Sequence, residues 1–267
     1  MSRRNALRAA LGCLLLLALL SACAPKETPP QETAEPPSPT GETKEPDDVP
    51  SGELEYYTFE PASYVKGDIV IKYPQIAGDA GGYDAARLNA LIEETALRDL
   101  KFMEDEPESY VYEIRYDVTY NKPELISILF IGYSYTQGAA HPSNFLRTLT
   151  LDTARAERVR LSDLVVIDAA FAEAVKNGRY TLLHEDITED HRKAVYEMIE
   201  DMGEEMWLER LRYADDVAAE ECSYLTGTAL GVSISVPHVL GGHIEILLDY
   251  SGLDAYRAEG SLLPKGE

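Results

Sequence analysis

The chain is poor in cysteine, histidine and positive charge. Its 267 residues include three cysteines, five histidines and one tryptophan, and 24 basic residues stand against 47 acidic ones. Three cysteines are too few for a disulfide scaffold. The negative balance argues against nucleic acid, whose phosphates select basic surfaces, and against electrostatic docking to anionic lipid. A net charge of −23 favours a cationic partner, or it serves solubility alone.

Apolar residues are present in ordinary amounts despite this acidity. Hydrophobic residues make up 45% of the chain and aromatic residues 9%. That fraction is enough to build a core, so a wholly disordered acidic protein is excluded.

The first 22 residues have the three parts of a bacterial lipoprotein signal peptide. Arg3, Arg4 and Arg8 are followed by an apolar run over 11–20, which is shorter than the roughly 20 residues of a spanning helix. The run ends in Leu20-Ser21-Ala22-Cys23, which resembles a lipobox. We therefore expect a mature chain that begins at a lipidated Cys23, on the extracytoplasmic face of the cell membrane. An ordinary secretory signal is the alternative.

Residues 23–52 are predicted to be a tether that follows the lipidated cysteine. The segment 24–52 contains eight prolines, seven acidic residues and no aromatic residue. Such a composition cannot bury enough surface to offset its ordering entropy. Membrane contact is then expected through the N-terminal lipid only. Cys222, the one cysteine left in the body, is expected to be a small buried apolar residue rather than a reactive thiol.

The body is predicted to be α+β, with antiparallel sheets packed with helices, either as one unit or as two small lobes, 53–137 and 138–267. Period-two alternation and turn residues define the expected strands, and 3.6-residue periodicity defines the helices. The expected strands are 56–59, 64–73, 110–120, 125–136, 145–151, 230–236 and 244–250. The expected helices are 84–103, capped by Asp84, 161–176 and 188–211. The strands 110–120, 125–136 and 145–151 predict an antiparallel meander.

Motifs for catalysis and metal binding are missing from the sequence. Gly132-Tyr133-Ser134 and Gly231-Val232-Ser233 lack the closing glycine of a nucleophile elbow and lie within strands. No H-E-x-x-H, C-x-x-C or EF-hand pattern occurs. We therefore predict no catalytic residue, no bound metal and no cofactor.

Negative charge is concentrated in residues 184–221, which hold 14 acidic against four basic residues. Five carboxylates of this segment are candidates for steering a basic protein. They are Glu197, Glu200, Asp201, Glu204 and Glu205. The alternative is that they form only the solvated face of an amphipathic helix.

Two short stretches resemble a known family. One is Gly138-Ala139-Ala140-His141-Pro142, followed by Leu161-Ser162-Asp163-Leu164. The other runs from Val236-Pro237-His238 through Gly241-Gly242-His243, followed by Tyr250-Ser251-Gly252-Leu253. Together they resemble the paired domains of unknown function in the extracytoplasmic part of the anti-sigma factor RsiV and in the peptidoglycan deacetylase PdaC. Ala139 and His238 depart from the usual Gly and Tyr.

The resemblance implies a binding or sensing module, because the RsiV domain is a receptor for lysozyme, a basic protein. The expected partner is a lysozyme-like basic protein or a cell-wall fragment. Candidate ligand-binding residues on the two loops are His141, Pro142, Pro237, His238 and Gly241, which could instead only shape turns. The rivals are an accessory domain of a wall hydrolase or deacetylase, with metal ligands from His141, His238 and His243, and an envelope scaffold.

Overall fold

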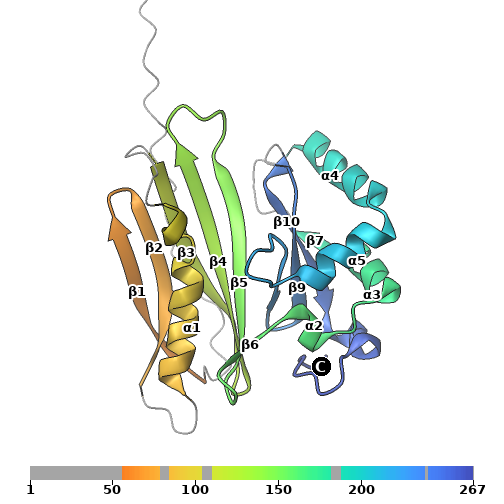
Figure 1. Cartoon of the computed structure of the whole chain (residues 1–267). Helices are drawn as coiled ribbons and strands as arrows, with labels where there is room; N and C mark the ends of the chain where they lie inside the picture. The colour runs from red at the N-terminus through yellow and green to blue at the C-terminus, as the bar shows by residue number, and fades with distance from the viewer. Residues whose placement is uncertain (1–55, 79–83, 104–109, 182–187, 238–239, 267) are drawn as a thin grey trace, which may run out of the picture. The chain divides into compact units, whose positions relative to one another are not determined.

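The computed structural model describes residues 56–78, 84–103, 110–181, 188–237 and 240–266, which form two sheets covered by helices (Figure 1). The six-stranded first sheet has the order β1-β2-β3-β4-β5-β6, and the four-stranded second sheet has the order β7-β10-β9-β8. This confirms the predicted α+β class. None of the helices in these ranges is long and apolar enough to cross a membrane.

The first sheet is antiparallel except for the parallel pair β2 and β3. Its strands are β1 (Thr58–Lys66), β2 (Ile69–Ala77), β3 (Tyr110–Asn121), β4 (Leu125–Thr136), β5 (Ser143–Asp152) and β6 (Glu157–Val159). The predicted meander is confirmed as β3, β4 and β5. Helix α1 (Ala85–Leu97) lies between β2 and β3 in the chain, followed by a 3₁₀ turn over Leu100–Phe102.

The second sheet is antiparallel throughout and contains the predicted terminal hairpin. Its strands are β7 (Arg179–Thr181), β8 (Cys222–Leu225), β9 (Ala229–Ser235) and β10 (His243–Asp249). The helices beside it are α2 (Leu161–Leu164), α3 (Ala169–Lys176), α4 (Glu189–Asp201) and α5 (Glu204–Tyr213). Short 3₁₀ turns at Tyr250–Gly252 and Asp254–Tyr256 follow β10.

Helix α1 begins at the predicted residue. The Asp84 carboxylate accepts a hydrogen bond of 3.0 Å from the Arg87 amide, which satisfies one of the free N–H groups at the helix start. Leu88 and Ile92 are fully buried, and they pack on one face of the first sheet. The helix ends at Leu97, earlier than the expected 103.

Strand β4 is central, as its apolar sequence predicted, because both of its faces are covered. Ile126, Ile128 and Phe130 point to the side of α1. The alternate residue Leu129 packs with Cys222 and Tyr224 of β8. The layers are therefore α1, the first sheet, the second sheet, and the helices α3 to α5, whose buried Trp207 packs on the second sheet.

Three expected elements are interrupted in the structure. Gly67, at a φ of +60°, turns the chain between β1 and β2, so the expected strand 64–73 is wrong. Gly203 takes the extended N-cap conformation of α5, which divides the expected helix 188–211. Asp168 caps α3 by accepting from the Phe171 amide, which divides the expected helix 161–176.

The two lobes were expected to meet near residue 138, but the first sheet continues past that point. Strands β4 and β5 pair from Ser134 with Ser143 to Leu125 with Asp152, so residues 137–142 form a hairpin turn. The chain passes to the second sheet only after Val159. The hydrogen-bond ladder between β4 and β5 therefore crosses residue 138.

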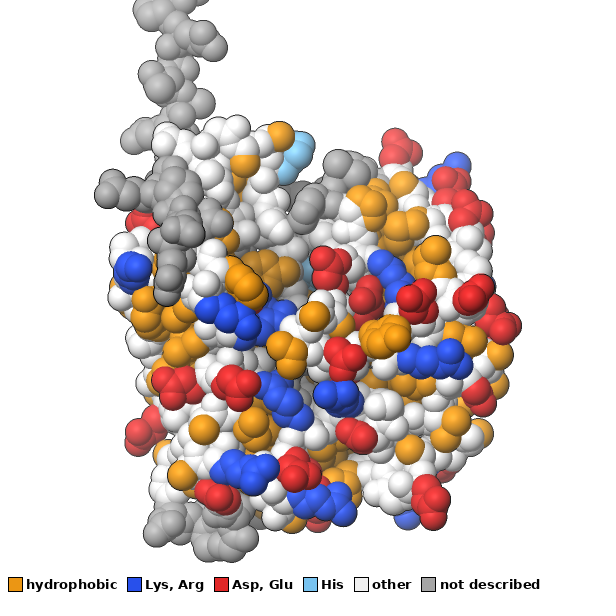
Figure 2. Space-filling view, viewed as in Figure 1, with side chains coloured by type: hydrophobic (Ala, Val, Ile, Leu, Met, Phe, Trp, Pro, Cys, Tyr) orange, Lys and Arg blue, Asp and Glu red, His pale blue; other side chains and the backbone are white. Residues whose placement is uncertain are grey.

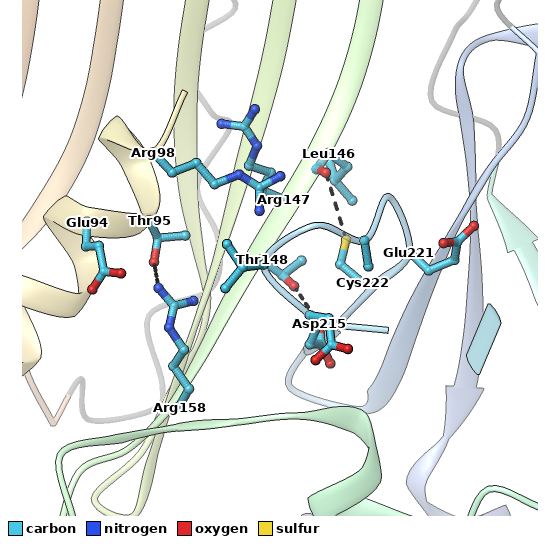
Figure 3. A pocket seen from close by; sticks show the side chains of 13 residues that line it. Glu94, Thr95, Arg98, Leu146, Arg147, Thr148, Arg158, Asp215, Glu221 and Cys222 are labelled. Carbon is cyan, nitrogen blue, oxygen red and sulfur yellow. Dashed lines mark hydrogen bonds between the residues drawn. The ribbon is translucent and has the colours of Figure 1, made fainter. Parts of the chain in front are cut away.

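Asp215, in the loop 214–221 between α5 and β8, joins the two sheets. Its carboxylate accepts hydrogen bonds from the Leu161 amide at 2.8 Å and from the Ser223 amide and hydroxyl at 2.7 and 2.6 Å. The Thr148 hydroxyl of β5 donates a fourth at 3.3 Å (Figure 3). Burial raises the pKa of Asp215, and the donors oppose this shift because they favour the ionised form.

A second polar contact between the sheets involves Ser127. Its hydroxyl lies 2.9 Å from the Thr150 hydroxyl and accepts a 3.0 Å hydrogen bond from the Leu225 amide of β8. Ser127 is fully buried, and these two bonds satisfy its hydroxyl group at the point where β8 crosses β4.

Glu245 is a buried acidic residue of β10 in the second sheet. It is 4% exposed, and the Tyr224 hydroxyl donates to its Oε2. Its Oε1 has no hydrogen-bond partner among the described residues. Burial raises the pKa of Glu245, because the charged form loses hydration, while the Tyr224 hydrogen bond lowers it.

We predict that Asp215→Asn lowers the free energy of unfolding by about 2–4 kcal/mol, because an amide group would face backbone donors. Urea denaturation of the wild type and the variant measures this. Asp216→Asn is the matched control. Asp216 is paired with Arg160 at 2.7 Å on the surface, so its loss should cost less than about 1 kcal/mol. Equal effects of the two substitutions would contradict the role given to Asp215.

We predict that Glu245→Gln becomes progressively more stable than the wild type as the pH rises. The raised pKa means that the folded wild type holds a proton that the unfolded chain has already lost. Wild-type stability therefore falls with pH between the ordinary glutamate pKa and the raised one, by about 1.4 kcal/mol per pH unit. Urea denaturation from about pH 4 to pH 8 measures the difference, with exposed Glu259→Gln as control. A constant difference at every pH would contradict this.

Candidate functional site

The two loops singled out by the sequence are the turns β4–β5 and β9–β10, which lie at the same end of the molecule in Figure 1. His141 and Pro142 are exposed on the first turn, and Pro237 is exposed at the start of the second. Gly241, at a φ of +107°, permits the second turn. His238 lies outside the described residues.

A wide groove with a cavity volume of about 670 Å³ lies beside the second turn. Its lining includes Met198 of α4, Met202 between the two helices, Met206 of α5 and the end of β9. We call it the methionine groove, and its lining residues are Met198, Asp201, Met202, Met206, Arg210, Ser235, Val236 and Pro237. Its one basic residue, Arg210, is paired with Glu221 at 3.2 Å. Two sequence candidates, Asp201 and Pro237, thus lie on one surface.

The break between α4 and α5 shapes this groove. Val195 and Ile199 of α4 and Trp207 of α5 are buried in the core on the second sheet. Met206, next to Trp207, is 52% exposed. Gly203 interrupts the helix, so α5 runs in a different direction from α4. The methionine groove lies between these two helices and the end of β9.

The acidic candidates lie on these helices, and one of them, Asp201, lines the groove. Glu197, Glu200, Asp201, Glu204 and Glu205 are all exposed. Lys193 lies 3.6 Å from Glu197, an exposed ion pair that adds little stability. Figure 2 shows acidic side chains on the side of α4 and α5, with hydrophobic side chains between them, while basic side chains gather along the middle of the view.

A second depression, of about 330 Å³, was missed by sequence reasoning. We call it the arginine cleft. It is formed by Arg98 after α1, by Ser143, Asn144 and Arg147 of β5, by Glu220 of the loop 214–221, and by Pro237. Strand β6 pairs only with Thr150–Asp152, so the first part of β5 lacks a partner strand on that side and is open to these side chains. No local motif signals the cleft, because five separate segments build it, the last being Gly242 and His243.

The histidines proposed as metal ligands lie in different environments. His141 is exposed on the β4–β5 turn, whereas His243 is 7% exposed at the start of β10. Within the described ranges, no group of three or more histidine, cysteine, aspartate or glutamate side chains could hold a metal ion.

The remaining thiol is buried, as the sequence predicted. Cys222 is 6% exposed in β8 and packs with Leu129 and Leu146. Burial raises the pKa of this thiol, so the reactive thiolate is disfavoured.

Two depressions among the described residues, the methionine groove and the arginine cleft, are suited to binding.

No protein-family model matches the chain, and no curated protein matches it. Solved structures of other proteins do match the chain. The chain shares a two-sheet α+β fold with a DUF3298 family protein from Pseudomonas aeruginosa PAO1, with a TM-score of 0.50 and 13% identity over 80% of this chain and 99% of that one. A member of the same family from Bacteroides fragilis NCTC 9343 matches with a TM-score of 0.44 and 16% identity, over 76% of this chain and 94% of that one. The first similarity shows a common fold, that of a domain of unknown function.

Proposed function

We propose that the protein is a lipid-anchored binding module on the extracytoplasmic face of the cell membrane, with no catalytic activity of its own. Its methionine groove docks a basic protein, which inserts an apolar side chain between α4, α5 and β9. The observation that carries this proposal is the exposed, methionine-lined groove on helices whose outer faces are acidic.

The chemistry of the groove fits such a partner. Methionine side chains are flexible and polarisable, so they adapt to the shape of an incoming apolar residue. The surrounding carboxylates attract a basic surface during encounter and repel acidic proteins. Apolar contact at the centre and charge at the rim is the usual arrangement of a protein interface.

The resemblance to the RsiV domain supports a lysozyme-like protein as the partner, because lysozyme is basic. A cell-wall fragment is the alternative ligand. The hydrolase, deacetylase and scaffold hypotheses draw no support from a particular cluster of described side chains. Stoichiometric zinc in the purified protein, lost in His141→Ala, would favour the metal-dependent rival and contradict the proposal.

We predict that the protein, purified without its lipid, binds a basic lysozyme at low salt and that the affinity falls as salt is added, because exposed charges are screened. Isothermal titration calorimetry at two salt concentrations measures this. Met206→Ala should weaken binding about tenfold, and Glu204→Gln with Glu205→Gln should reduce its salt dependence.

Val65→Ala and Glu259→Gln are the matched controls, since both residues are exposed outside the groove; Val65 is 64% exposed. They should bind as the wild type does. Absence of binding at low salt would overturn the lysozyme proposal, and equal affinity of the Met206 and Val65 variants would remove the groove from it.

We predict that Cys23→Ser releases the protein from membranes into the soluble fraction, because the lipid is the expected membrane attachment. Fractionation of cells that express the wild type or the variant, followed by detection of the chain, measures this. Cys222→Ser is the matched cysteine control and should stay in the membrane fraction. Retention of the Cys23 variant in membranes would contradict lipid anchoring.

A further inference from the structure

The two arginines of the arginine cleft lie close together and have the same acidic partner. Arg98 and Arg147 share one carboxylate, that of Asp99. Arg98 Nε lies 3.4 Å from Asp99, and Arg147 forms a closer ion pair with the same side chain. Asp99 alone does not neutralise both guanidinium groups, and Glu220 is the other acidic residue at the cleft.

The two guanidinium groups are close enough to affect each other. Figure 3 shows the side chains of Arg98 and Arg147 side by side between α1 and β5. Burial lowers the pKa of Arg98, and the charge of Arg147 lowers it further. Holding like charges together in a half-buried site costs free energy, which a bound anion would offset.

Arg147 also has unused hydrogen-bond donors. Its side chain is 7% exposed, and its Nε and Nη1 have no acceptor among the described residues. The ring of Phe145 lies 4.7 Å from the guanidinium carbon and covers one face of the group. Buried donors without an acceptor are uncommon in proteins, and where they occur an ion or a ligand can supply the acceptor.

The walls of the cleft supply further polar groups. Ser143 and Asn144 precede Arg147 on β5 and line the same space. Glu220 lies on the loop 214–221, where its carboxylate accepts a hydrogen bond of 2.7 Å from the Ser235 hydroxyl. The cleft therefore combines two cationic side chains with one acidic residue, in a space of about 330 Å³ that suits a small molecule.

We propose that the arginine cleft binds the carboxylate group of a small ligand or of a peptide end, with Arg98 and Arg147 as its partners. A planar carboxylate matches the fork of a guanidinium group and accepts two parallel hydrogen bonds. A carboxylate adds a single negative charge beside Asp99 and Glu220, whereas phosphate adds up to two and is opposed by them more strongly. This site shares Ser235, Val236 and Pro237 with the methionine groove, but its two arginines lie outside that groove, and the proposal does not depend on docking of a basic protein.

The test uses two matched probes, N-acetylalanine and N-acetylalanine amide, which differ in the carboxylate. Titration of the mature chain, monitored by amide NMR shifts, should show binding of the acid with a Kd on the order of 1 mM, because the ligand is small. The amide and inorganic phosphate should bind at least tenfold more weakly. Equal binding of acid and amide, absence of binding by the acid, or preference for phosphate would each overturn the proposal.

Variants locate the site. Arg98→Gln should weaken binding of N-acetylalanine about tenfold, and its fold should be kept because the Arg98 side chain is 28% exposed. Arg87→Gln is the matched control near the start of α1; Arg87 is 57% exposed and paired with Glu157, and the variant should bind as the wild type does. Arg147→Lys keeps a charge near Asp99 but loses the fork, so it should also bind weakly. Equal binding by the Arg98 and Arg87 variants would exclude the cleft.

Discussion

The structure depends on one carboxylate, that of Asp215, which receives donors from three separate parts of the chain. A hydroxyl of β5 in the first sheet, the amide and hydroxyl of Ser223 in β8, and the amide that starts α2 all point to it. The backbone of Asp215 has a positive φ of +69°, and in this conformation the side chain reaches all of these donors. Aspartate tolerates this conformation better than most residues. Apolar side chains also pack between the sheets, and this polar contact adds a directional constraint on their arrangement.

The loop that carries Asp215 also determines where the molecule is open. It covers the part of β5 that β6 leaves without a partner strand, and it forms one side of the arginine cleft. The methionine groove lies on the opposite side of Pro237, which borders both depressions. Two surfaces of different chemistry, one apolar with acidic surroundings and one cationic, are thus neighbours at the β9–β10 turn. A ligand in one surface would lie close to an occupant of the other.

Local patterns predicted the local parts of this architecture. Alternation predicted β3, β9 and β10, the apolar run over 125–136 predicted β4 as a central strand, and the Asp84 cap predicted the start of α1. The breaks at Gly67, Gly203 and Asp168 were missed, since apolar periodicity continues across them. The acidic helices and Pro237 were predicted from composition and a family resemblance. Arg98 and Arg147 could not be, because their proximity depends on how α1 packs against β5, which no short pattern encodes.

The sole tryptophan gives this fold a built-in optical reporter. Trp207 is fully buried between α5 and the second sheet, whereas the core beneath α1 is built from tyrosine, phenylalanine and aliphatic residues. Tryptophan emission therefore follows the packing around the second sheet alone, while far-ultraviolet circular dichroism follows both sheets. Coincident transitions by the two methods would show that the sheets unfold as one cooperative unit, and separate transitions would show that each has its own stability.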